Sequence, residues 1–266
     1  MRPNPIREKL SAGQPTIATR VLLPDPAVIE AVGQTGVFDY VEFLAEYNAF
    51  TLHDLDAIGR AGELYGLGTM IKLDYEQNHY LAQRAVGSGF HGVLFADMRT
   101  RDDVERAVAS VRPDTPEHGG TYGAAARRNA RPTYGGGEQY IARVAETVVG
   151  VMVEKRESFD DLDALLSVPG IDFVQWGPTD FRMSSGGSTA EIDAVRQRVF
   201  DACRRHGVPA RIELGSLDEF SDLTAQGFRH FSLGIDLEML YFGWKQLGTE
   251  ARELLVEAEP TAAVLP

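Results

Sequence analysis

Short runs of β-branched and aromatic residues alternate along this chain with longer stretches in which apolar residues recur with a helical period. The short runs have the length of strands buried on both faces, whereas the longer stretches are typical of amphipathic helices. Glycines such as Gly66, Gly207 and Gly227 mark the ends of the helical stretches. This pattern predicts eight strands, at residues 16–22, 38–45, 69–73, 92–96, 148–154, 172–176, 210–213 and 230–233.

Strands that alternate with helices in this way imply parallel βαβ units. The helical patterns lie at residues 26–34, 53–65, 76–86, 101–111, 138–145, 160–167, 190–206 and 217–226. Eight such units in about 250 residues are typical of a (β/α)8 TIM barrel, which we predict as a single domain over residues 1–259. The alternative is a doubly wound open sheet. No glycine fingerprint follows the first strand, which disfavours a dinucleotide-binding version of that sheet.

Two segments depart from this rhythm. Residues 113–137 contain glycine and alanine clusters without the period of a strand or helix, which predicts a functional or disordered loop. The helical stretch at 237–257 carries the large apolar residues Met239, Leu240, Tyr241, Phe242 and Trp244. An outer helix does not need so much apolar surface, so we predict a subunit interface at this C-terminal helix. The tail at residues 260–266 is predicted to be disordered.

The composition narrows the class of protein. An apolar content of 44% and a charged content of 24% are ordinary for a globular protein of 266 residues. The formal net charge of −13 disfavours nucleic-acid binding, which requires a basic surface. No apolar run approaches the roughly 18–20 residues that span a bilayer, and the N-terminus lacks the apolar core of a signal peptide. The single Cys203 excludes an internal disulfide. We therefore expect a cytoplasmic protein with no membrane partner.

Two acidic residues follow neighbouring predicted strands. Glu154 ends the strand at 148–154, and Asp180 closes the run Trp176-Gly177-Pro178-Thr179-Asp180 after the next strand. Because the carboxyl ends of parallel strands meet on one rim of a barrel, both side chains can reach one divalent cation. Carboxylate oxygens suit Mg²⁺ or Mn²⁺, although a strand-end acid can also be a helix cap. Gly177, Pro178 and Thr179 are predicted to form a rigid turn whose backbone N–H groups bind a substrate carboxylate.

Other polar residues near strand ends have structural as well as functional interpretations. Lys72 lies inside an apolar strand, where it must pair with an anion or lose its proton. Asp97 is either functional or the cap of the next helix. Arg211 and Glu213 alternate on one face and are either functional or a buried ion pair that closes the barrel. The histidines lack metal-binding spacing, which disfavours a zinc hydrolase, and no G-x-S-x-G elbow or Walker loop is present.

Several segments of the chain, taken in order, resemble the motifs of one known family. They are Leu23-Pro24-Asp25-Pro26-Ala27, Phe38-Asp39-Tyr40-Val41 with Glu46, Lys72, Val153-Glu154, Gly177-Pro178-Thr179-Asp180 and Leu233-Gly234-Ile235-Asp236. Together they resemble the HpcH/HpaI aldolase/citrate lyase family, the class II pyruvate aldolases with a barrel of the phosphoenolpyruvate/pyruvate-binding type. The resemblance covers nearly the whole chain, and its more specific part is the glutamate with the Gly-Pro-x-Asp motif.

The resemblance implies a barrel that binds Mg²⁺, Mn²⁺ or Co²⁺, often in a hexamer with an exchanged C-terminal helix. Glu154 and Asp180 stand at the positions of the metal ligands. A small 2-oxo acid such as pyruvate is the implied substrate, and it chelates the ion through its carboxylate and keto oxygens. The ion then acts as a Lewis acid that stabilises an enolate when the carbon–carbon bond breaks. We expect a homo-oligomer, either a trimer or a hexamer.

Three positions depart from the family pattern. The family places an acid and a histidine after the second strand for proton transfer through water, but here Leu44 and Tyr47 stand at those positions. The arginine that ends the third strand in the family is replaced by Lys72, which keeps the charge without the bidentate fork. The family's Gly-rich segment with arginine and aromatic residues corresponds here to residues 120–129 with their alanines.

From these features we predict a divalent-metal-dependent carbon–carbon lyase, with Lys72, Tyr47 and Glu46 as catalytic residues. Lys72 is the expected partner of the oxyanion, and Tyr47 or Glu42 is expected to assist proton movement. Decarboxylation or condensation would need less help from a histidine base than aldol cleavage. Two alternatives are a Schiff base at Lys72, if burial lowers its pKa, and a catalytically degenerate barrel that binds a 2-oxo acid or serves as an assembly partner.

Overall fold

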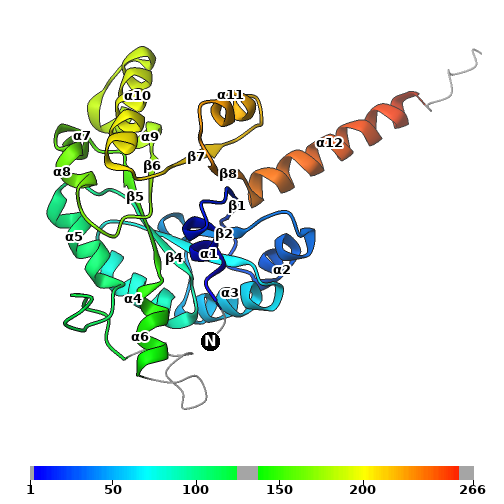
Figure 1. Cartoon of the computed structure of the whole chain (residues 1–266). Coiled ribbons are helices and arrows are strands. Elements are labelled where there is room, and N and C mark those ends of the chain that lie inside the picture. Colours follow the sequence, from blue (N-terminus) through cyan, green and yellow to red (C-terminus); the bar gives the residue numbers. More distant parts are fainter. Residues whose placement is uncertain (1–2, 125–136, 258–266) are drawn as a thin grey trace, which may run out of the picture.

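A computed structural model describes residues 3–124 and 137–257. Its eight strands form a closed parallel barrel in which each strand pairs with the next along the chain and the last pairs with the first (Figure 1). They are β1 (Thr16–Val21), β2 (Tyr40–Leu44), β3 (Gly68–Leu73), β4 (Gly92–Phe95), β5 (Val148–Val153), β6 (Phe173–Trp176), β7 (Ala210–Leu214) and β8 (His230–Ile235). The predicted TIM barrel is confirmed, and each predicted strand is present with its ends shifted by at most two residues.

Most helices also follow the prediction. They are α2 (Pro26–Thr35), α3 (Leu52–Tyr65), α4 (Asn78–Ser88), α5 (Arg101–Ser110), α6 (Glu138–Ala145), α10 (Thr189–His206), α11 (Phe220–Ala225) and α12 (Asp236–Glu257). The helix predicted at 160–167 is present as the shorter α8 (Leu162–Leu166), which starts after Asp161 leaves the helical region with φ −125° and ψ 40°. Four elements were not predicted, namely α1 (Pro5–Ser11), α7 (Arg156–Asp160), α9 (Pro178–Ser185) and the 3₁₀ turn η1 (Ala45–Tyr47).

Alternation along the strands separates an outer from an inner group of buried side chains. Val41 and Ile71 belong to the larger core, which lies between the strands and the helices. Tyr40 and Met70, one position away, belong to a smaller core inside the barrel. Because side chains of a strand alternate between its faces, Lys72 lies on the inner face, two residues after Met70. The strand period therefore directs this charged side chain toward the barrel axis.

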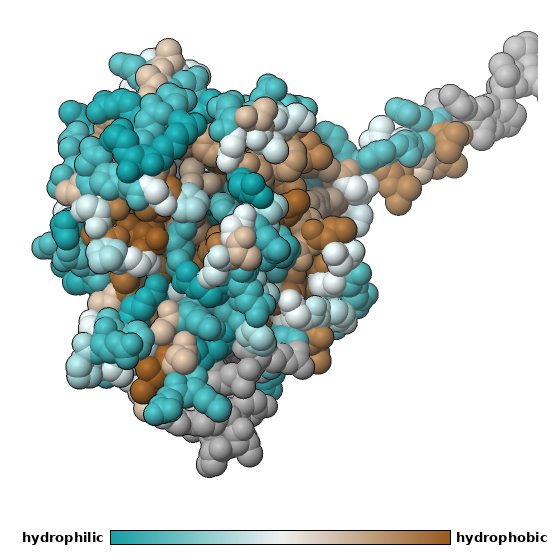
Figure 2. Space-filling view, in the orientation of Figure 1, coloured by the Kyte–Doolittle hydropathy of each residue, from teal (hydrophilic) through white to brown (hydrophobic). Residues whose placement is uncertain are grey.

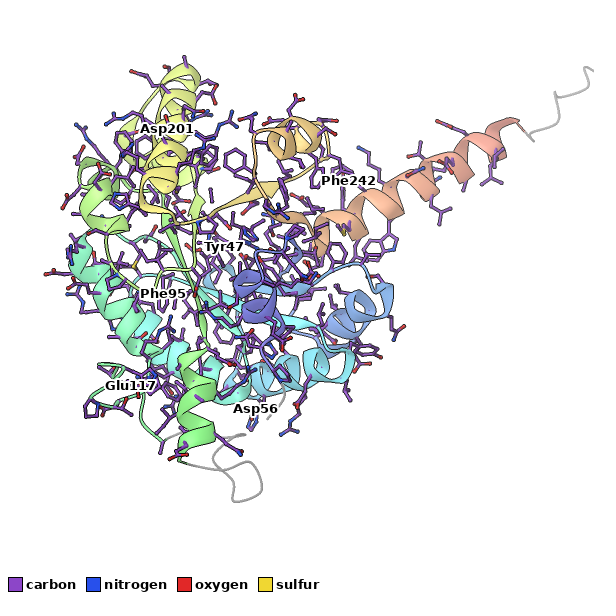
Figure 3. The ribbon with its side chains drawn as sticks, in the orientation of Figure 1. Tyr47, Asp56, Phe95, Glu117, Asp201 and Phe242 are labelled. Carbon is purple, nitrogen blue, oxygen red and sulfur yellow. The ribbon has the colours of Figure 1, made fainter. Side chains whose placement is uncertain are left out.

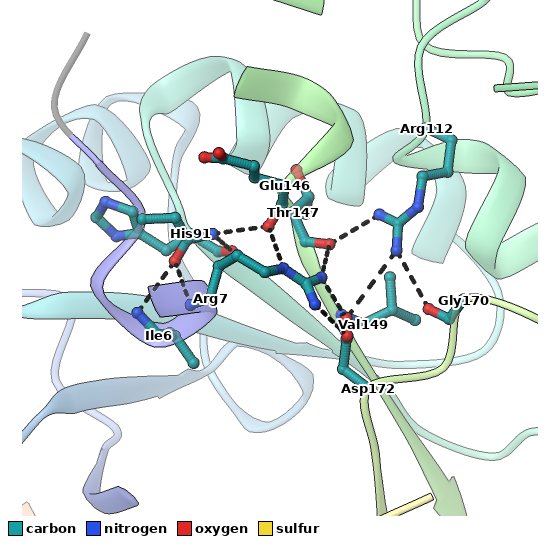
Figure 4. Close-up of polar contacts among 10 residues, drawn as sticks. Ile6, Arg7, His91, Arg112, Glu146, Thr147, Val149, Gly170 and Asp172 are labelled. Carbon is teal, nitrogen blue, oxygen red and sulfur yellow. Dashed lines mark hydrogen bonds and ion pairs between the residues drawn. The ribbon is translucent and has the colours of Figure 1, made fainter. Parts of the chain in front are cut away.

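The unpredicted helix α1 closes the N-terminal end of the barrel. Ile6 of α1 packs into the inner core. Asn4 caps the helix by accepting from the N–H groups of Ile6 and Arg7, and its amide donates to the carbonyl of His91 at 2.8 Å. Arg7 forms a two-pronged ion pair with Asp172, with distances of 2.5 and 2.7 Å (Figure 4). These polar contacts join the start of the chain to the segments that precede β4 and β6.

The described part of the irregular segment also lies at the N-terminal end of the barrel. Residues 113–124 follow α5, and Pro113 forms an isolated bridge with Tyr122. Arg112, beside them, donates to the carbonyl of Thr147 just before β5, at 2.7 Å. In Figure 3, Glu117 of this segment lies beside α6, away from the part of the molecule that holds Tyr47. The rest of the predicted Gly-rich loop, residues 125–136, lies outside the described residues.

Helix α12 projects from the barrel into solvent (Figure 1). Met239, Phe242 and Trp244 are 52%, 61% and 70% exposed, and Figure 2 shows brown hydrophobic residues beside teal hydrophilic ones along the projecting helix. The start of α12 is fixed, because Asp236 accepts the N–H groups of Leu22 and Leu23 at 2.9 and 3.0 Å. The subunit interface at this helix and the single domain over residues 1–259 stay predictions. The tail at residues 260–266 lies outside the described residues. Over the described ranges, no helix has the length and apolar character needed to cross a membrane.

Candidate active site

A cavity of about 390 Å³ opens where the carboxyl ends of the strands meet. Active sites of (β/α)8 barrels are built at this end because the loops that follow the strands converge there. The charged residues of its inner wall come from five different strands or the loops after them, and they are Arg20, Lys72, Glu154, Asp180, Arg211 and Glu213. This convergence of ionisable groups marks the cavity as the candidate active site.

A larger hollow of about 590 Å³ lies at the opposite end of the barrel, between α1 and α10. Three charged residues of its lining, Arg7, Asp172 and Arg204, have structural partners within the described chain. Asp172 holds Arg7, and Arg204 donates to Asp201 at 2.7 Å. Since these groups already stabilise the fold, we place the candidate active site at the carboxyl ends of the strands.

Glu154 is the most buried acid of the cavity, with 2% of its surface exposed. Its Oε1 accepts the backbone N–H of Asp97 at 2.8 Å. Burial raises the pKa of Glu154 to about 7, with smaller contributions from Asp97 and Asp180, although Lys72 and the Asp97 N–H lower it. Gly177 is needed beside this carboxylate, because a Cβ there would lie 2.4 Å from Glu154 Oε2.

The segment after β6 corrects one prediction. Gly177-Pro178-Thr179-Asp180 is the first turn of α9 and not an isolated tight turn. A Gly-Pro pair is typical of turns, but proline also starts helices, where its missing N–H costs nothing. Asp180 lies in this first turn, where the positive end of the helix dipole favours a carboxylate. Gly177, Pro178 and Thr179 line the cavity, and their role in substrate binding stays a prediction.

Lys72 is buried and is held by two neighbours from η1. Its Nζ lies 2.7 Å from Glu46 Oε2 and donates to the Tyr47 hydroxyl at 2.5 Å. Burial lowers the pKa of Lys72, but Glu154, Tyr47 and Glu46 raise it by more, so the net shift is upward. A Schiff base requires a neutral amine, so this environment disfavours the imine alternative. The three predicted catalytic residues are therefore in contact with one another, and their roles stay predictions.

Tyr47 presents its ring to solvent and its hydroxyl to Lys72. The residue is 55% exposed, and η1 carries it at the edge of the cavity. Desolvation of the hydroxyl raises the pKa of Tyr47 to about 12, although the Lys72 ammonium opposes this shift. The phenol is therefore protonated at neutral pH. It can donate a proton, but it cannot replace a histidine base in that state.

A second network crosses the inside of the barrel below the cavity. Arg211 forms an ion pair with Glu42, both of them buried, and donates to the Tyr40 hydroxyl at 2.8 Å. Glu213 instead pairs with Arg20 and accepts the Gln175 amide at 2.9 Å. The suggested ion pair between Arg211 and Glu213 is thus wrong, because each residue pairs with a residue of another strand. Side chains that point into a barrel can meet across it as well as along one strand.

Glu42 was an alternative to Tyr47 for assisting proton movement. Its complete burial and its ion pair with Arg211 give it a structural partner. A carboxylate in this setting compensates the buried guanidinium, and removal of either partner would leave an uncompensated charge. We therefore treat Glu42 as part of the barrel interior.

Asp97 and Lys155 complete the rim, and Lys155 was not identified from the sequence. Thr100, and not Asp97, caps α5, so the helix-cap interpretation of Asp97 is wrong. Asp97 adopts a left-handed φ of 58°, which is uncommon for any residue but glycine. Lys155 Nζ lies 2.8 Å from Asp97 Oδ1 and 3.0 Å from Asp180 Oδ1. Only the direct adjacency to Glu154 could have signalled Lys155 in the sequence.

The charges of this rim fit a divalent cation. The ammonium groups are those of Lys72 and Lys155. They are outnumbered by the carboxylates of Glu46, Asp97, Glu154 and Asp180. When all are ionised, the acidic excess equals the charge of one Mg²⁺ or Mn²⁺. Within residues 3–124 and 137–257, no three metal-binding side chains come together, so two carboxylates are the most that the described chain offers. Mg²⁺ often binds through one or two carboxylates, with water and substrate as further ligands.

A closed parallel barrel with its charged residues gathered at the carboxyl ends of the strands defines a (β/α)8-barrel enzyme. A family model described as HpcH/HpaI aldolase/citrate lyase matches residues 51–241. The chain therefore belongs to the HpcH/HpaI aldolase/citrate lyase family, as the sequence motifs predicted, and it is a carbon–carbon lyase of the aldolase type.

Individual relatives agree with this assignment. A hydroxypyruvate/pyruvate aldolase of Rhizorhabdus wittichii is 27% identical over 258 residues, 94% of this chain and 100% of the relative. A 2-keto-3-deoxy-L-rhamnonate aldolase of Escherichia coli O1:K1 is 28% identical over 244 residues, 90% of this chain and 89% of the relative. Among solved structures, an HpcH/HpaI aldolase/citrate lyase family protein from Burkholderia cenocepacia J2315 superposes with a TM-score of 0.84. It is 24% identical, over 94% of this chain and 100% of that chain, and its likeness supports the fold.

Proposed function

We propose that this protein is a divalent-metal-dependent aldolase that makes or breaks a carbon–carbon bond next to the keto group of a small 2-oxo acid. The convergence of Glu154, Asp180 and Lys72 on one cavity carries this proposal. The names of the two aldolase relatives, which specify pyruvate, hydroxypyruvate and a keto-deoxy sugar acid, support the substrate class. Family membership disfavours the alternative of a degenerate barrel.

Glu154 and Asp180 are the residues that would hold the ion, with Mg²⁺ or Mn²⁺ as the proposed metal and Co²⁺ as a further candidate. When bound, the ion supplies Lewis acidity to the oxygens of the substrate. The upward shift in the pKa of Glu154 supports this assignment, because burial of the carboxylate outweighs the opposing effect of the Lys72 ammonium. A cation beside Glu154 would add to that opposing effect.

Lys72 is the proposed partner of the negative charge that develops on the keto oxygen. An ammonium group has three N–H donors, and Glu46 and Tyr47 account for two of those on Lys72. The third can serve a substrate oxygen while the other two fix the position of the charge. We propose Tyr47 as a proton donor, in keeping with its raised pKa, and Gly177, Pro178 and Thr179 as the anion-binding start of α9.

Enolisation of pyruvate tests the proposal. Metal-depleted protein is mixed with pyruvate in D₂O, with and without Mn²⁺ or Mg²⁺, and the loss of the methyl signal is followed by NMR after removal of the metal. We expect exchange only with metal, and about 100-fold slower exchange in Lys72→Met, because one charged donor at a developing oxyanion typically contributes that much.

Glu219→Gln is the matched control, because Glu219 lines the same cavity but its side chain is 61% exposed. It should exchange at the normal rate, whereas Glu154→Gln should be inactive at every metal concentration tested. Exchange that is equally fast without metal would overturn the metal-dependent mechanism. Borohydride trapping of pyruvate on Lys72 would instead establish the imine route.

We also propose a homo-oligomer, a trimer or hexamer, with the exposed apolar face of α12 at the subunit contact. The projection of this helix and its exposed aromatic residues support a partner, and a second copy of the chain is the simplest one. The buried free thiol of Cys203 is compatible with a reducing compartment, which supports our proposal of a cytoplasmic protein.

A further inference from the structure

Lys155 occupies a position between two carboxylates of the rim. It directly follows Glu154, and its Nζ lies 2.8 Å from Asp97 Oδ1 and 3.0 Å from Asp180 Oδ1. The lysine side chain is only 14% exposed, so water does not fully screen these contacts. Asp180 therefore already has a positive partner, contributed by the residue next to Glu154.

Asp97 contacts both Glu154 and Lys155. Its backbone N–H donates to Glu154 Oε1 at 2.8 Å, while its carboxylate binds Lys155. Asp97 makes both contacts while its backbone adopts a left-handed φ of 58°. A non-glycine residue keeps such a backbone conformation only where its surroundings enforce it.

We propose that Lys155 is a tethered cation that competes with the divalent ion for Asp180, and that Asp97 is the carboxylate that retains Lys155 when the ion binds. This inference rests on the proposed metal site at Glu154 and Asp180. In the ion-free protein Lys155 bridges Asp97 and Asp180. In the ion-bound protein it contacts Asp97 alone, because an ammonium and a divalent cation on one carboxylate repel each other. The pair of Asp97 and Lys155 thus sets the affinity for the ion without contacting it.

Binding of Mn²⁺ to chelator-treated protein, measured as free Mn²⁺ by electron paramagnetic resonance, tests the role of Lys155. Lys155→Met removes the competing charge and should tighten Mn²⁺ binding about tenfold, within the range by which groups around a metal site change affinity. Lys155→Arg keeps the charge and should not tighten binding. Lys9→Met is the control for net charge, because Lys9 pairs with Asp39 at the other end of the barrel. It should leave the dissociation constant unchanged.

A double-mutant cycle tests the role of Asp97. Asp97→Asn leaves Lys155 with Asp180 as its remaining partner, so Mn²⁺ binding should weaken about tenfold. Asparagine tolerates left-handed backbone conformations, so the contact from its N–H to Glu154 is expected to persist. In the Lys155→Met background the same substitution should have no effect, since the lysine through which Asp97 acts is gone. Equal weakening in both backgrounds would show that Asp97 acts on the ion directly, which overturns the proposal.

Two ligand variants separate this inference from the proposed function. Glu154→Gln and Asp180→Asn should each abolish tight Mn²⁺ binding. If both bind Mn²⁺ as the unmodified protein does, the proposed metal pair is wrong, and the inference that rests on it is overturned too. If they lose binding but Lys155→Met does not gain it, the metal pair stands and only the competition by Lys155 is refuted. Melting temperatures without metal show that each variant is folded.

Discussion

At the scale of single residues, the site depends on a carboxylate held where its charge is unfavourable. Glu154 is almost fully buried, and burial moves its pKa from the usual 4.5 to about 7. The folded protein therefore binds a proton at Glu154 more tightly than the unfolded chain does. Without a cation, this residue favours the folded state at pH values below 4.5, and that contribution is lost as the pH rises through 7.

Glu154→Gln should consequently stabilise the metal-free protein, and more at high pH than at low pH. A pKa difference of this size predicts a gain of about 3 kcal/mol at pH 8 and of less than about 1 kcal/mol at pH 5. Urea denaturation in the presence of a chelator measures both values. The same gain at both pH values would mean that the ionisation of Glu154 is not its cause.

Gly177 is a second residue whose role follows from close contact. A Cβ at this position would lie 2.4 Å from Oε2 of Glu154, so Gly177→Ala must displace the carboxylate. We expect Mn²⁺ affinity to fall by roughly 10- to 100-fold, because orientation of a ligand by its surroundings typically contributes that much. Calorimetric titration with Mn²⁺ provides the measurement. Gly123→Ala is the matched control, since a Cβ at Gly123 meets nothing within 4 Å; a similar loss in the control would exclude this explanation.

At the scale of elements, the strands were predictable because their residues report burial directly. Val148–Val153 is a continuous apolar run, as expected for a strand covered on both faces. Helix α9 was not predictable from Gly177-Pro178, since this pair starts a turn as readily as a helix. Helix α1 has only seven residues, too few for a helical period to stand out, and what fixes it is tertiary. Its anchors are Asp172 and the carbonyl of His91, both distant in sequence.

The anchoring of α1 can be tested through Arg7. Arg7→Met removes a two-pronged ion pair whose side chains are only 24% and 13% exposed, and it leaves Asp172 with fewer donors. We expect a loss of about 1–2 kcal/mol in the free energy of unfolding, as charge-assisted pairs of this kind contribute. Lys9→Met, in the same helix, removes a more exposed pair and should cost less than about 1 kcal/mol. Urea denaturation of both variants measures these losses. Equal losses in the free energy of unfolding would contradict the proposed anchoring of α1 by Arg7.

At the scale of the whole molecule, the barrel and the strand that carries each candidate residue could be predicted, but the partners of these residues could not. The apolar run around Lys72 predicted that this lysine needs an anion or loses its proton, yet only the folded chain brings Glu46 to Lys72 and Arg211 to Glu42. The same holds for Lys155, whose partners Asp97 and Asp180 follow β4 and β6, the strands on either side of β5. Pairing across a closed barrel depends on stagger and tilt, which single-residue patterns do not encode.

Helix α12 gives a prediction for the assembly. Phe242→Glu with Trp244→Glu places two charges on its exposed apolar face, so the proposed oligomer should dissociate to monomers and its melting temperature should fall. Light scattering after size-exclusion chromatography measures the mass. Leu64→Glu is the control, because Leu64 is 70% exposed on α3 and should leave the mass unchanged. A chain that is monomeric before substitution would refute the proposed interface.

The pairing of β8 with β1 also has a consequence for synthesis. Thr16 and His230 contact each other at 3.0 Å although 214 positions separate them. A ribosome that adds about 5–20 residues per second needs roughly 10–40 seconds to make that span. During this time the outer edge of β1 has no β8 to pair with, and an unpaired strand edge invites association with other chains. The nascent chain is therefore most exposed to aggregation just before its last strand emerges, and a chain that ends before His230 never leaves that state.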